Sequence, residues 1–353
     1  MGHNPSFTSK QVILLIYGNC FKHKSPRFLM VLMGGDIRRV LVTGAMGQIG
    51  SELVEDLQDR YGIDNVLATD IRDPHDDFIG NYEELDVLEQ ERVNELIKQY
   101  DIDTTYHLAA ILSAVGEKKP ELAWKVNIEG FYNILAVAKK GEISKIFHPS
   151  SIAAFGPETP KIETPQETVL KPRTIYGITK VVGELLGNYY YEKWGVDVRG
   201  ARLPGVISSV SPPGGGTTDY AVEIFYEAIK NQKYTCFLKP DSTLPMIYMP
   251  DCLKAFQMLM DAPVEILEHH TDFNLGALSF SPEELAAEIK THIPEFTITY
   301  EPDFRQKIAD SWPKSIEDSA AREEWGWSPD FGLKTMVADM LKVLRERYDR
   351  GEL

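Results

Sequence analysis

Residues 40–50 read VLVTGAMGQIG, in which glycines recur at every third position directly after an apolar run. A tight turn between a strand and a helix needs Gly44, and close approach of a phosphate to the backbone favours Gly47. Gly50 allows the helix to pack closely on the strand. The free N–H groups at the start of that helix attract an anion. The segment therefore predicts a strand–turn–helix unit that holds the pyrophosphate of a dinucleotide.

Apolar strand-like runs alternate with amphipathic helical patterns from residue 38 to about residue 205. Ile49, Leu53 and Leu57, for example, share one face of the first helix. Such alternation is typical of a parallel sheet with helices on both faces, so we expect a Rossmann-type, doubly wound α/β fold. We expect strands at 38–44, 65–70, 104–110, 144–151 and 196–204, and helices at 48–62, 88–100, 120–140 and 176–194.

After Pro204 the pattern loosens and the loops lengthen, with helices expected at Tyr220–Lys230 and Pro282–Ile289. We therefore predict a dinucleotide-binding domain over 37–205 and a smaller, mixed α/β substrate domain over 206–353. The strand–helix pattern at 244–262 is expected to return to the first domain.

Residues 1–36 are treated as an extension, because residues 1–35 contain no Asp or Glu but four Lys and Arg residues. Such a leader is typical of an organelle transit peptide, or reflects a translation start placed too early, with Met30 or Met33 as the true start. The second interpretation is favoured because the fold pattern begins immediately afterwards. We accordingly expect a cytoplasmic protein, or one of an organelle matrix if the leader is a transit peptide.

The formal net charge of −16 argues against nucleic acid as a partner, since phosphate contacts need clustered Lys and Arg. No apolar stretch approaches the length of a membrane span. Three cysteines form no CxxC pair and eight histidines show no ligand spacing, so we expect a reduced compartment and no metal site.

Asp70 ends the second expected strand, 20 residues after Gly50. A carboxylate there accepts from the adenosine ribose hydroxyls and repels a 2′-phosphate, which predicts NAD rather than NADP, although Arg72 weakens this distinction. The complete set of expected cofactor contacts is Gly44, Gly47, Gln48, Ile49, Gly50, Asp70, Arg72, Asp86, Val87, Leu108, Ala109, Ala110, Asn127, Tyr176, Lys180 and Pro204.

The pattern Tyr-x-x-x-Lys occurs at Tyr176/Lys180, Tyr189/Lys193 and Tyr226/Lys230. Only Tyr176 stands at the start of its helix and follows a strand-end serine, Ser151, at the sheet edge where ligands bind. Tyrosine has a free pKa of about 10, and a nearby Lys180 ammonium and the nicotinamide charge would favour its phenolate. With Ser151 holding the substrate oxygen, these side chains predict oxidation of an alcohol by hydride transfer.

TGxxGxxG, the strand-end serine and YxxxK follow the order found in extended short-chain dehydrogenases, over roughly residues 38–345. The segments PSSIAAFGP, PGVISSVSPPGGGTTDYAVEIF, LPMIYMPDCLKA and DFRQKIADSWPKSIEDSAAREEWGW are similar to short-chain L-threonine 3-dehydrogenases. The resemblance implies NAD-dependent oxidation of the threonine 3-hydroxyl to 2-amino-3-oxobutanoate, and a homodimer paired through helices 120–140 and 176–194. It implies Tyr176 as base, Lys180 as its partner, Ser151 orienting the hydroxyl, and an amino-acid pocket lined by Ser113, Thr217, Thr218, Asp219 and Trp312.

Two alternatives share these motifs. A nucleotide-sugar epimerase must also hold a diphosphate, for which arginine is favoured, but Arg305 is the single arginine between Arg202 and Arg322. A non-enzymatic NAD-binding sensor could dispense with Tyr176 and Lys180, which this chain keeps.

The segment SPPGGGTTD at 211–219 lacks the Lys-Ser/Thr of a phosphate-binding loop. We interpret it as a hinged lid over the substrate, in which Gly214–Gly216 flex. Asp219 is a candidate N-cap for the helix that follows.

Overall fold

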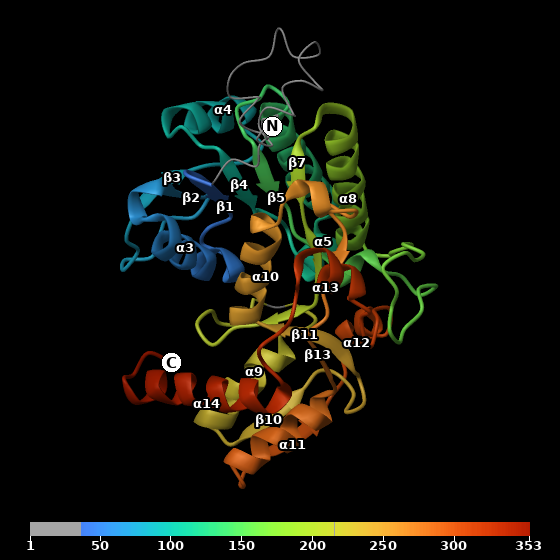
Figure 1. Cartoon of the computed structure of the whole chain (residues 1–353). Coiled ribbons are helices and arrows are strands. Elements are labelled where there is room, and N and C mark those ends of the chain that lie inside the picture. The colour runs from blue at the N-terminus through green and yellow to red at the C-terminus, as the bar shows by residue number, and fades with distance from the viewer. Residues whose placement is uncertain (1–36, 215) are drawn as a thin grey trace, which may run out of the picture. The chain divides into compact units, whose positions relative to one another are not determined.

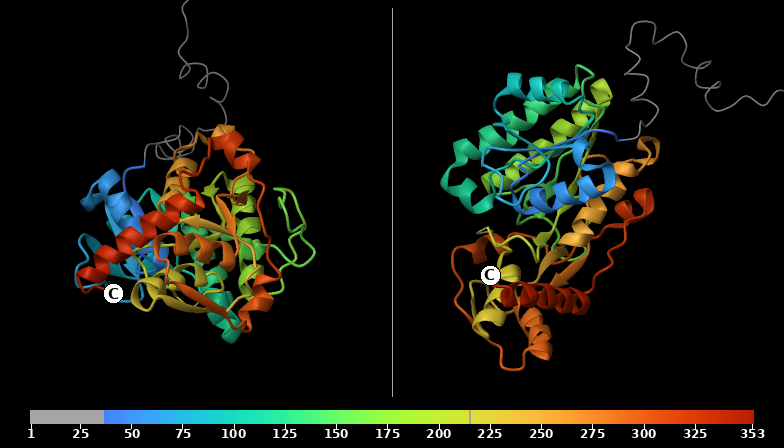
Figure 2. Two further views of the ribbon diagram at one scale, coloured as in Figure 1. Left: turned by 90° about the horizontal axis from the view of Figure 1, so that it is seen from below. Right: turned by 90° about the vertical axis from the view of Figure 1, so that its left-hand side faces the viewer.

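The structure is a computed structural model that describes residues 37–214 and 216–353. The expectations for residues 1–36 lie outside the described residues. Residues Ile37–Leu353 form one compact unit. Within it, Figures 1 and 2 show a larger α/β part that carries the central sheet and a smaller part that carries α9, α11 and the C-terminal helix α14.

A six-stranded sheet of parallel strands forms the centre of the larger part, in the order β3-β2-β1-β4-β5-β7. The direction of winding reverses between β1 and β4, which is the point where such sheets bind ligands beyond the carboxyl ends of their strands. This order confirms the doubly wound Rossmann-type fold. The strands are β1 Val40–Thr43, β2 Val66–Asp70, β3 Asn81–Glu84, β4 Thr104–His107, β5 Lys145–Phe147 and β7 Asp197–Arg199.

Helices cover both faces of this sheet because successive side chains of a strand point to opposite sides. Val40 and Val42 lie in one apolar cluster with helices α3 (Gln48–Tyr61) and α10 (Met249–Asp261). Leu41, between them in sequence, lies in another cluster with the helices of the opposite face. Those helices are α4 Gln90–Gln99, α7 Phe131–Ala138 and α8 Ile175–Trp194.

The expected strands at 144–151 and 196–204 are each broken in two, which corrects the sequence-based prediction. Pro149 has no N–H to donate, and β6 (Ser150–Ser151) follows it in a separate small sheet. Gly200 separates β7 from β8 (Ala201–Leu203), and a Cβ there would lie 2.2 Å from the His148 carbonyl oxygen. The order of this small sheet is β12-β8-β6, with β12 formed by Phe273–Asn274.

The expected helix at 120–140 also differs. It consists of α6 (Pro120–Trp124), a π-helical turn (Lys125–Gly130) and α7. Helix α5 (Ser113–Lys118) and strand β3 were not expected. The residues of β3 are half-buried or exposed and show no apolar alternation, so the sequence gives little sign of a strand.

The smaller part packs around a core that includes Tyr220, Phe225 and Met336. Its strands form two small sheets, β13-β11-β9 and β10-β14. The strands are β9 Gly205–Ile207, β10 Lys233–Cys236, β11 Leu244–Tyr248, β13 Leu278–Phe280 and β14 Thr297–Tyr300. The helices from residue 216 onwards, besides α10, are α9 Tyr220–Lys230, α11 Pro282–His292, α12 Arg305–Ala309, α13 Ser319–Trp325 and α14 Leu333–Asp349.

Among residues 37–214 and 216–353, no helix is long and apolar enough to cross a membrane. The same residues contain no cluster of His, Cys, Asp and Glu side chains that could hold a metal ion. Cys236 and Cys252 are free thiols and both are buried.

Candidate active site

The glycine turn between β1 and α3 forms a cradle that only glycine allows. Gly44 has φ +69°, and a Cβ on it would lie 2.7 Å from the Ala109 backbone nitrogen. A Cβ on Gly50 would lie 2.2 Å from the Gly44 carbonyl oxygen. Gly47 precedes the first turn of α3, where backbone N–H groups are free to bind an anion. These residues fit a dinucleotide pyrophosphate.

Gln48 supports the same assignment. Its side-chain nitrogen Nε2 is buried at the first turn of α3 and has no hydrogen-bond partner among the described residues. A buried donor without an acceptor is costly, so an acceptor supplied by a bound molecule would satisfy it. The half-buried Ile49 lies beside it in the same turn.

Asp70 lies at the carboxyl end of β2, where the adenosine ribose was expected. Its carboxylate accepts hydrogen bonds from the Met46 backbone and from Arg72. Asp86 accepts from the Leu88 N–H in the turn after β3. Val87 packs against Gly130 of the π-helical turn.

The remaining expected cofactor residues line the carboxyl edge of β4 and the neighbouring connections. Leu108, Ala109 and Ala110 directly follow β4. The Asn127 side chain exchanges hydrogen bonds with the Ile111 backbone and donates to Thr179 Oγ1, so it ties the loop after β4 to α8. Pro204 is buried between β8 and β9.

Ser151, Tyr176 and Lys180 come together from two elements at this edge. Ser151 ends β6, and its hydroxyl lies close enough to Tyr176 of α8 to lower the pKa of that phenol. Lys180 lies one turn further along α8, with its Nζ 5.3 Å from the centre of the Tyr176 ring. The same Nζ donates to the Pro149 carbonyl oxygen at 2.7 Å. The structure thus brings together the three side chains expected to carry the chemistry.

Two local features place Tyr176 next to Ser151. Thr174 caps α8 by accepting from the Gly177 N–H, which fixes where the helix begins. Gly177 lies so close to the chain after β6 that a Cβ would be 2.2 Å from the Ala153 carbonyl oxygen. The start of the helix can therefore approach the strand end only because this residue is glycine.

Burial dominates the ionisation of the pair. It raises the pKa of Tyr176 to about 12, and the nearby Ser151 hydroxyl opposes this only in part. Burial lowers the pKa of Lys180 to about 8, while the Glu184 carboxylate acts in the opposite direction. Burial thus makes the phenol harder to ionise than expected. Lys180 donates to the Pro149 carbonyl oxygen rather than to the tyrosine.

The other two Tyr-x-x-x-Lys pairs lie elsewhere. Lys193 donates to the Tyr189 hydroxyl at 2.8 Å on the exposed side of α8. Lys230 lies over the Tyr226 ring on α9. Neither tyrosine has a hydrogen bond with a strand-end serine, so contact between tyrosine and lysine alone does not identify the site.

The residues implied to bind the amino acid lie on three segments. Trp312 is buried in the same apolar cluster as Ile152, against which Tyr176 also packs. Ser113 is buried at the start of α5, the helix whose Gly116 faces Tyr176. Helix α5 therefore lies beside Tyr176, and Trp312 belongs to the apolar cluster against which Tyr176 packs.

The segment before α9 supplies Thr217, Thr218 and Asp219. The Thr217 hydroxyl is buried without a hydrogen-bond partner among residues 37–214 and 216–353. Thr218 packs over Gly205 at the start of β9. Asp219 stands at the N-cap position of α9 but its side chain caps nothing in the helix, because its carboxylate accepts from the preceding Gly216 N–H. Asp219 is thus the N-cap residue of α9 by position, as expected, but its side chain does not make the cap hydrogen bond.

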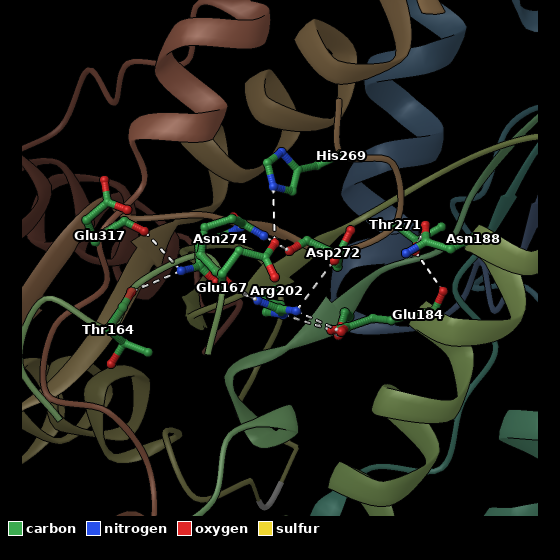
Figure 3. A network of polar contacts seen from close by, with 12 residues as sticks. Thr164, Glu167, Glu184, Asn188, Arg202, His269, Thr271, Asp272, Asn274 and Glu317 are labelled. Atoms are coloured by element: carbon green, nitrogen blue, oxygen red, sulfur yellow. Dashed lines mark hydrogen bonds and ion pairs between the residues drawn. The ribbon is translucent and has the colours of Figure 1, made fainter. Parts of the chain in front are cut away.

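Sequence reasoning missed a buried polar network around Arg202 (Figure 3). Arg202 of β8 makes two hydrogen bonds with Glu184 of α8, each 3.0 Å long. Its guanidinium also donates to the Gln166 carbonyl oxygen and to Asn274. Ser150, next to Ser151, donates to the same Glu184. The signal available in the sequence was Arg202, a charged residue within the expected strand VDVRGARLP.

The chain leading into the glycine-rich segment is anchored on two helices. Ser208 donates to Glu52 of α3, the helix of the glycine turn. Arg347 of α14 donates to the carbonyl oxygens of Ser209 and Val210, each at 2.7 Å. Ser211 donates to the carbonyl oxygen of Gln48. This segment thus links the expected cofactor helix to the C-terminal helix.

Glu52 makes this anchor sensitive to pH. Burial raises its pKa from 4.5 to about 7, against the opposing hydrogen bond from Ser208. Between those values the unfolded chain loses its proton before the folded protein does, so stability falls as pH rises through this window and the loss is complete above it. We compare the free energy of unfolding of Glu52→Gln with that of the parent. The difference should change in favour of the variant by roughly 1–2 kcal/mol when the pH is raised from 5 to 8. Urea unfolding at both pH values measures this difference, and an equal gap at both would contradict the assignment.

A separate cavity of 820 Å³ lies between α9, β10 and α14. Its lining includes Tyr226, Tyr234 and Arg347 but none of the expected catalytic, cofactor or substrate residues. The glycine turn and the Ser151–Tyr176–Lys180 group, rather than this cavity, are the candidate site.

Comparison with known families agrees with this geometry. The model of the NAD-dependent epimerase/dehydratase family matches residues 40–276, a range that includes the glycine turn, Ser151, Tyr176 and Lys180. The chain belongs to this family. An epimerase/dehydratase fold of this kind uses NAD, which the glycine cradle fits.

Among related epimerase/dehydratase proteins, the mitochondrial L-threonine 3-dehydrogenase of Bos taurus is 48% identical over 87% of this chain and 82% of its own length. The solved L-threonine dehydrogenase of Phytophthora infestans is 51% identical, with a TM-score of 0.85, over 88% of this chain and 99% of its own. A solved L-threonine 3-dehydrogenase from a metagenome, described as monomeric, is 48% identical with a TM-score of 0.85, over 87% and 99%.

Proposed function

We propose that this protein oxidises L-threonine at its 3-hydroxyl to 2-amino-3-oxobutanoate with NAD as the oxidant. The observation that carries this is the meeting of Ser151, Tyr176 and Lys180 at the carboxyl edge of the sheet, next to the glycine turn. The relatives named as L-threonine dehydrogenases, about half identical over most of the chain, support the substrate.

Each side chain has one task in this reaction. The Ser151 hydroxyl holds the substrate oxygen beside Tyr176, and the phenolate form of Tyr176 takes the proton from the substrate hydroxyl. The Lys180 ammonium stabilises that phenolate against the effect of burial. NAD, when bound, would accept a hydride from the substrate carbon that carries this hydroxyl.

The amino-acid end of the substrate is assigned to the segment before α9. The buried Thr217 hydroxyl has no partner among the described residues and can bond a carboxylate or an ammonium. Asp219 supplies a buried carboxylate two residues on. Ser113 and Trp312 close the pocket from the other two segments.

Formation of NADH with L-threonine, its allo-diastereomer, serine and UDP-sugars tests the proposal. We expect NAD to be reduced with L-threonine as substrate. The kcat/KM with allo-threonine and with serine should be at least about tenfold lower, because a pocket discriminates between substrates by its polar contacts. Interconversion of UDP-sugars without net NADH would favour an epimerase. Saturable NAD binding without turnover of any substrate would favour a sensor.

We also propose that the protein pairs through α6–α7 and α8. Leu122, Trp124 and Tyr132 on α6–α7 and Ile178 and Leu185 on α8 are large apolar side chains that are 38% to 64% exposed. Helices α6 and α7 both pack against α8, so these exposed side chains belong to one group of adjacent helices. A second copy of the chain would bury them, although one relative is described as monomeric.

Leu185→Glu should therefore convert the dimer to a monomer, because it places a charge on the most exposed of these apolar side chains. Size-exclusion chromatography with light scattering measures the mass directly. Ile79→Glu, at a site 72% exposed in another part of the chain, serves as the control and should leave the mass unchanged. A parent protein that already runs as a monomer would contradict the pairing.

We place the protein in the cytoplasm, or in an organelle matrix if residues 1–35 act as a transit peptide.

A further inference from the structure

The carboxylate of Asp70 is fully occupied in the free protein. Oδ1 accepts from the Arg72 backbone N–H at 3.1 Å and from its Nε at 3.0 Å. Oδ2 accepts from the Met46 N–H and from Arg72 Nη2, both at 2.9 Å. A carboxylate offers about four acceptor positions, so none is left for another donor.

Two of these four donors are fixed and two can move. The Met46 N–H belongs to the glycine turn, and the backbone at 70–72 is held by the Tyr82 hydroxyl, which donates to both the Asp70 and Arg72 carbonyl oxygens. The Arg72 side chain, in contrast, is 59% exposed, while that of Asp70 is 4% exposed. Only the guanidinium can leave, and it would free one position on each carboxylate oxygen.

That pair of positions matches what the adenosine ribose requires, since its two hydroxyls donate to the acid at this strand end. The guanidinium also lies over the glycine turn, with Nη2 3.9 Å from the point where a Cβ of Gly47 would stand. A ribose bound at Asp70 would need the two acceptor positions that Arg72 Nε and Nη2 fill.

We propose that Arg72 is a specificity-determining residue that competes with the adenosine ribose for Asp70 and, once displaced, stands beside the ribose as a cation. The proposal rests on the use of NAD in the proposed function. The competition weakens binding of NAD, because the Asp70–Arg72 hydrogen bonds must first break. The displaced charge lessens the repulsion between Asp70 and a 2′-phosphate, so the chain rejects NADP less strongly than Asp70 alone would.

Titration calorimetry of the full chain with NAD, NADP and ADP-ribose, without substrate, tests this directly. Arg72→Met keeps the aliphatic stem but removes both movable donors. We expect it to bind NAD and ADP-ribose about threefold to tenfold more tightly and NADP at least about threefold more weakly. Arg72→Lys keeps a charge without the fork, so NADP binding should stay within about twofold of the parent.

Arg305→Met is the matched control, because Arg305 makes the same fork on Asp303, two residues earlier, with Nε and Nη2. It should leave binding of all three molecules unchanged. Unchanged or weaker NAD binding in Arg72→Met, or unchanged NADP binding, would overturn the proposal. Because the readout is binding, a protein that fails to oxidise threonine but shows these shifts would refute the proposed function and leave the role of Arg72 in place.

Discussion

Tyr176→Phe is expected to lower kcat with L-threonine by about 10²–10⁴-fold, because the variant has no group to take the hydroxyl proton. Binding of NAD, measured by titration calorimetry, should stay close to that of the parent. The glycine turn and Asp70, which are expected to hold most of the cofactor, lie on other elements. Steady-state NADH formation gives kcat, and the two measurements together separate chemistry from binding.

The matched control is Tyr189→Phe on the same helix. Tyr189 also belongs to a Tyr-x-x-x-Lys pair and even receives a hydrogen bond from Lys193, but it lies on the exposed side of α8. It should keep near-normal turnover. Near-normal turnover in Tyr176→Phe would instead show that Tyr176 is not the base. The fold assignment does not depend on this result.

Arg202→Met should destabilise the protein by about 3–5 kcal/mol, since it leaves the Glu184 carboxylate buried without its counter-ion. Both side chains are almost fully buried, at 3% and 4% exposure. Glu184 stands one turn after Lys180 and also accepts from Ser150, so activity should fall with stability. Urea unfolding at constant pH gives the free-energy change.

Two further variants test the cause of that loss. Arg322→Met breaks an ion pair with Asp318 at the surface, where Arg322 is 47% exposed, and should cost no more than about 1 kcal/mol. Arg202→Met combined with Glu184→Leu removes both charges and should recover at least half of the loss. A double variant no more stable than Arg202→Met would show that the loss comes from packing rather than from an unpaired charge.

The sheet and the glycine turn could be predicted because local rules decide them. Apolar runs such as VLVTG alternate with helical patterns, and Gly44 and Gly50 occupy positions where a Cβ would collide with the backbone. The choice of Tyr176 rested on its place after a strand-end serine, and the structure places it close to Ser151. The glycine turn depends on residues close together along the chain, and Tyr176 was chosen from the order of strand end and helix start rather than from a contact.

What could not be predicted depends on contacts distant in sequence. The break at Gly200 comes from the approach of the His148 and Thr271 carbonyl oxygens, and neither contact is visible in the strand pattern. The Arg202–Glu184 pair joins a strand to a helix, and no sequence pattern indicates which of the buried charged side chains face each other. The raised pKa of Tyr176 follows from burial, which periodicity does not measure.

Gly177, which follows Tyr176, affects how related sequences are read. Tyr189 and Tyr226 are followed by Tyr190 and Glu227, whose side chains could not fit against the Ala153 carbonyl oxygen as Gly177 does. A search for Tyr-Gly-x-x-Lys in this chain finds one match where Tyr-x-x-x-Lys finds three. The glycine thus identifies the candidate base among the three tyrosines, which the tyrosine–lysine spacing alone does not.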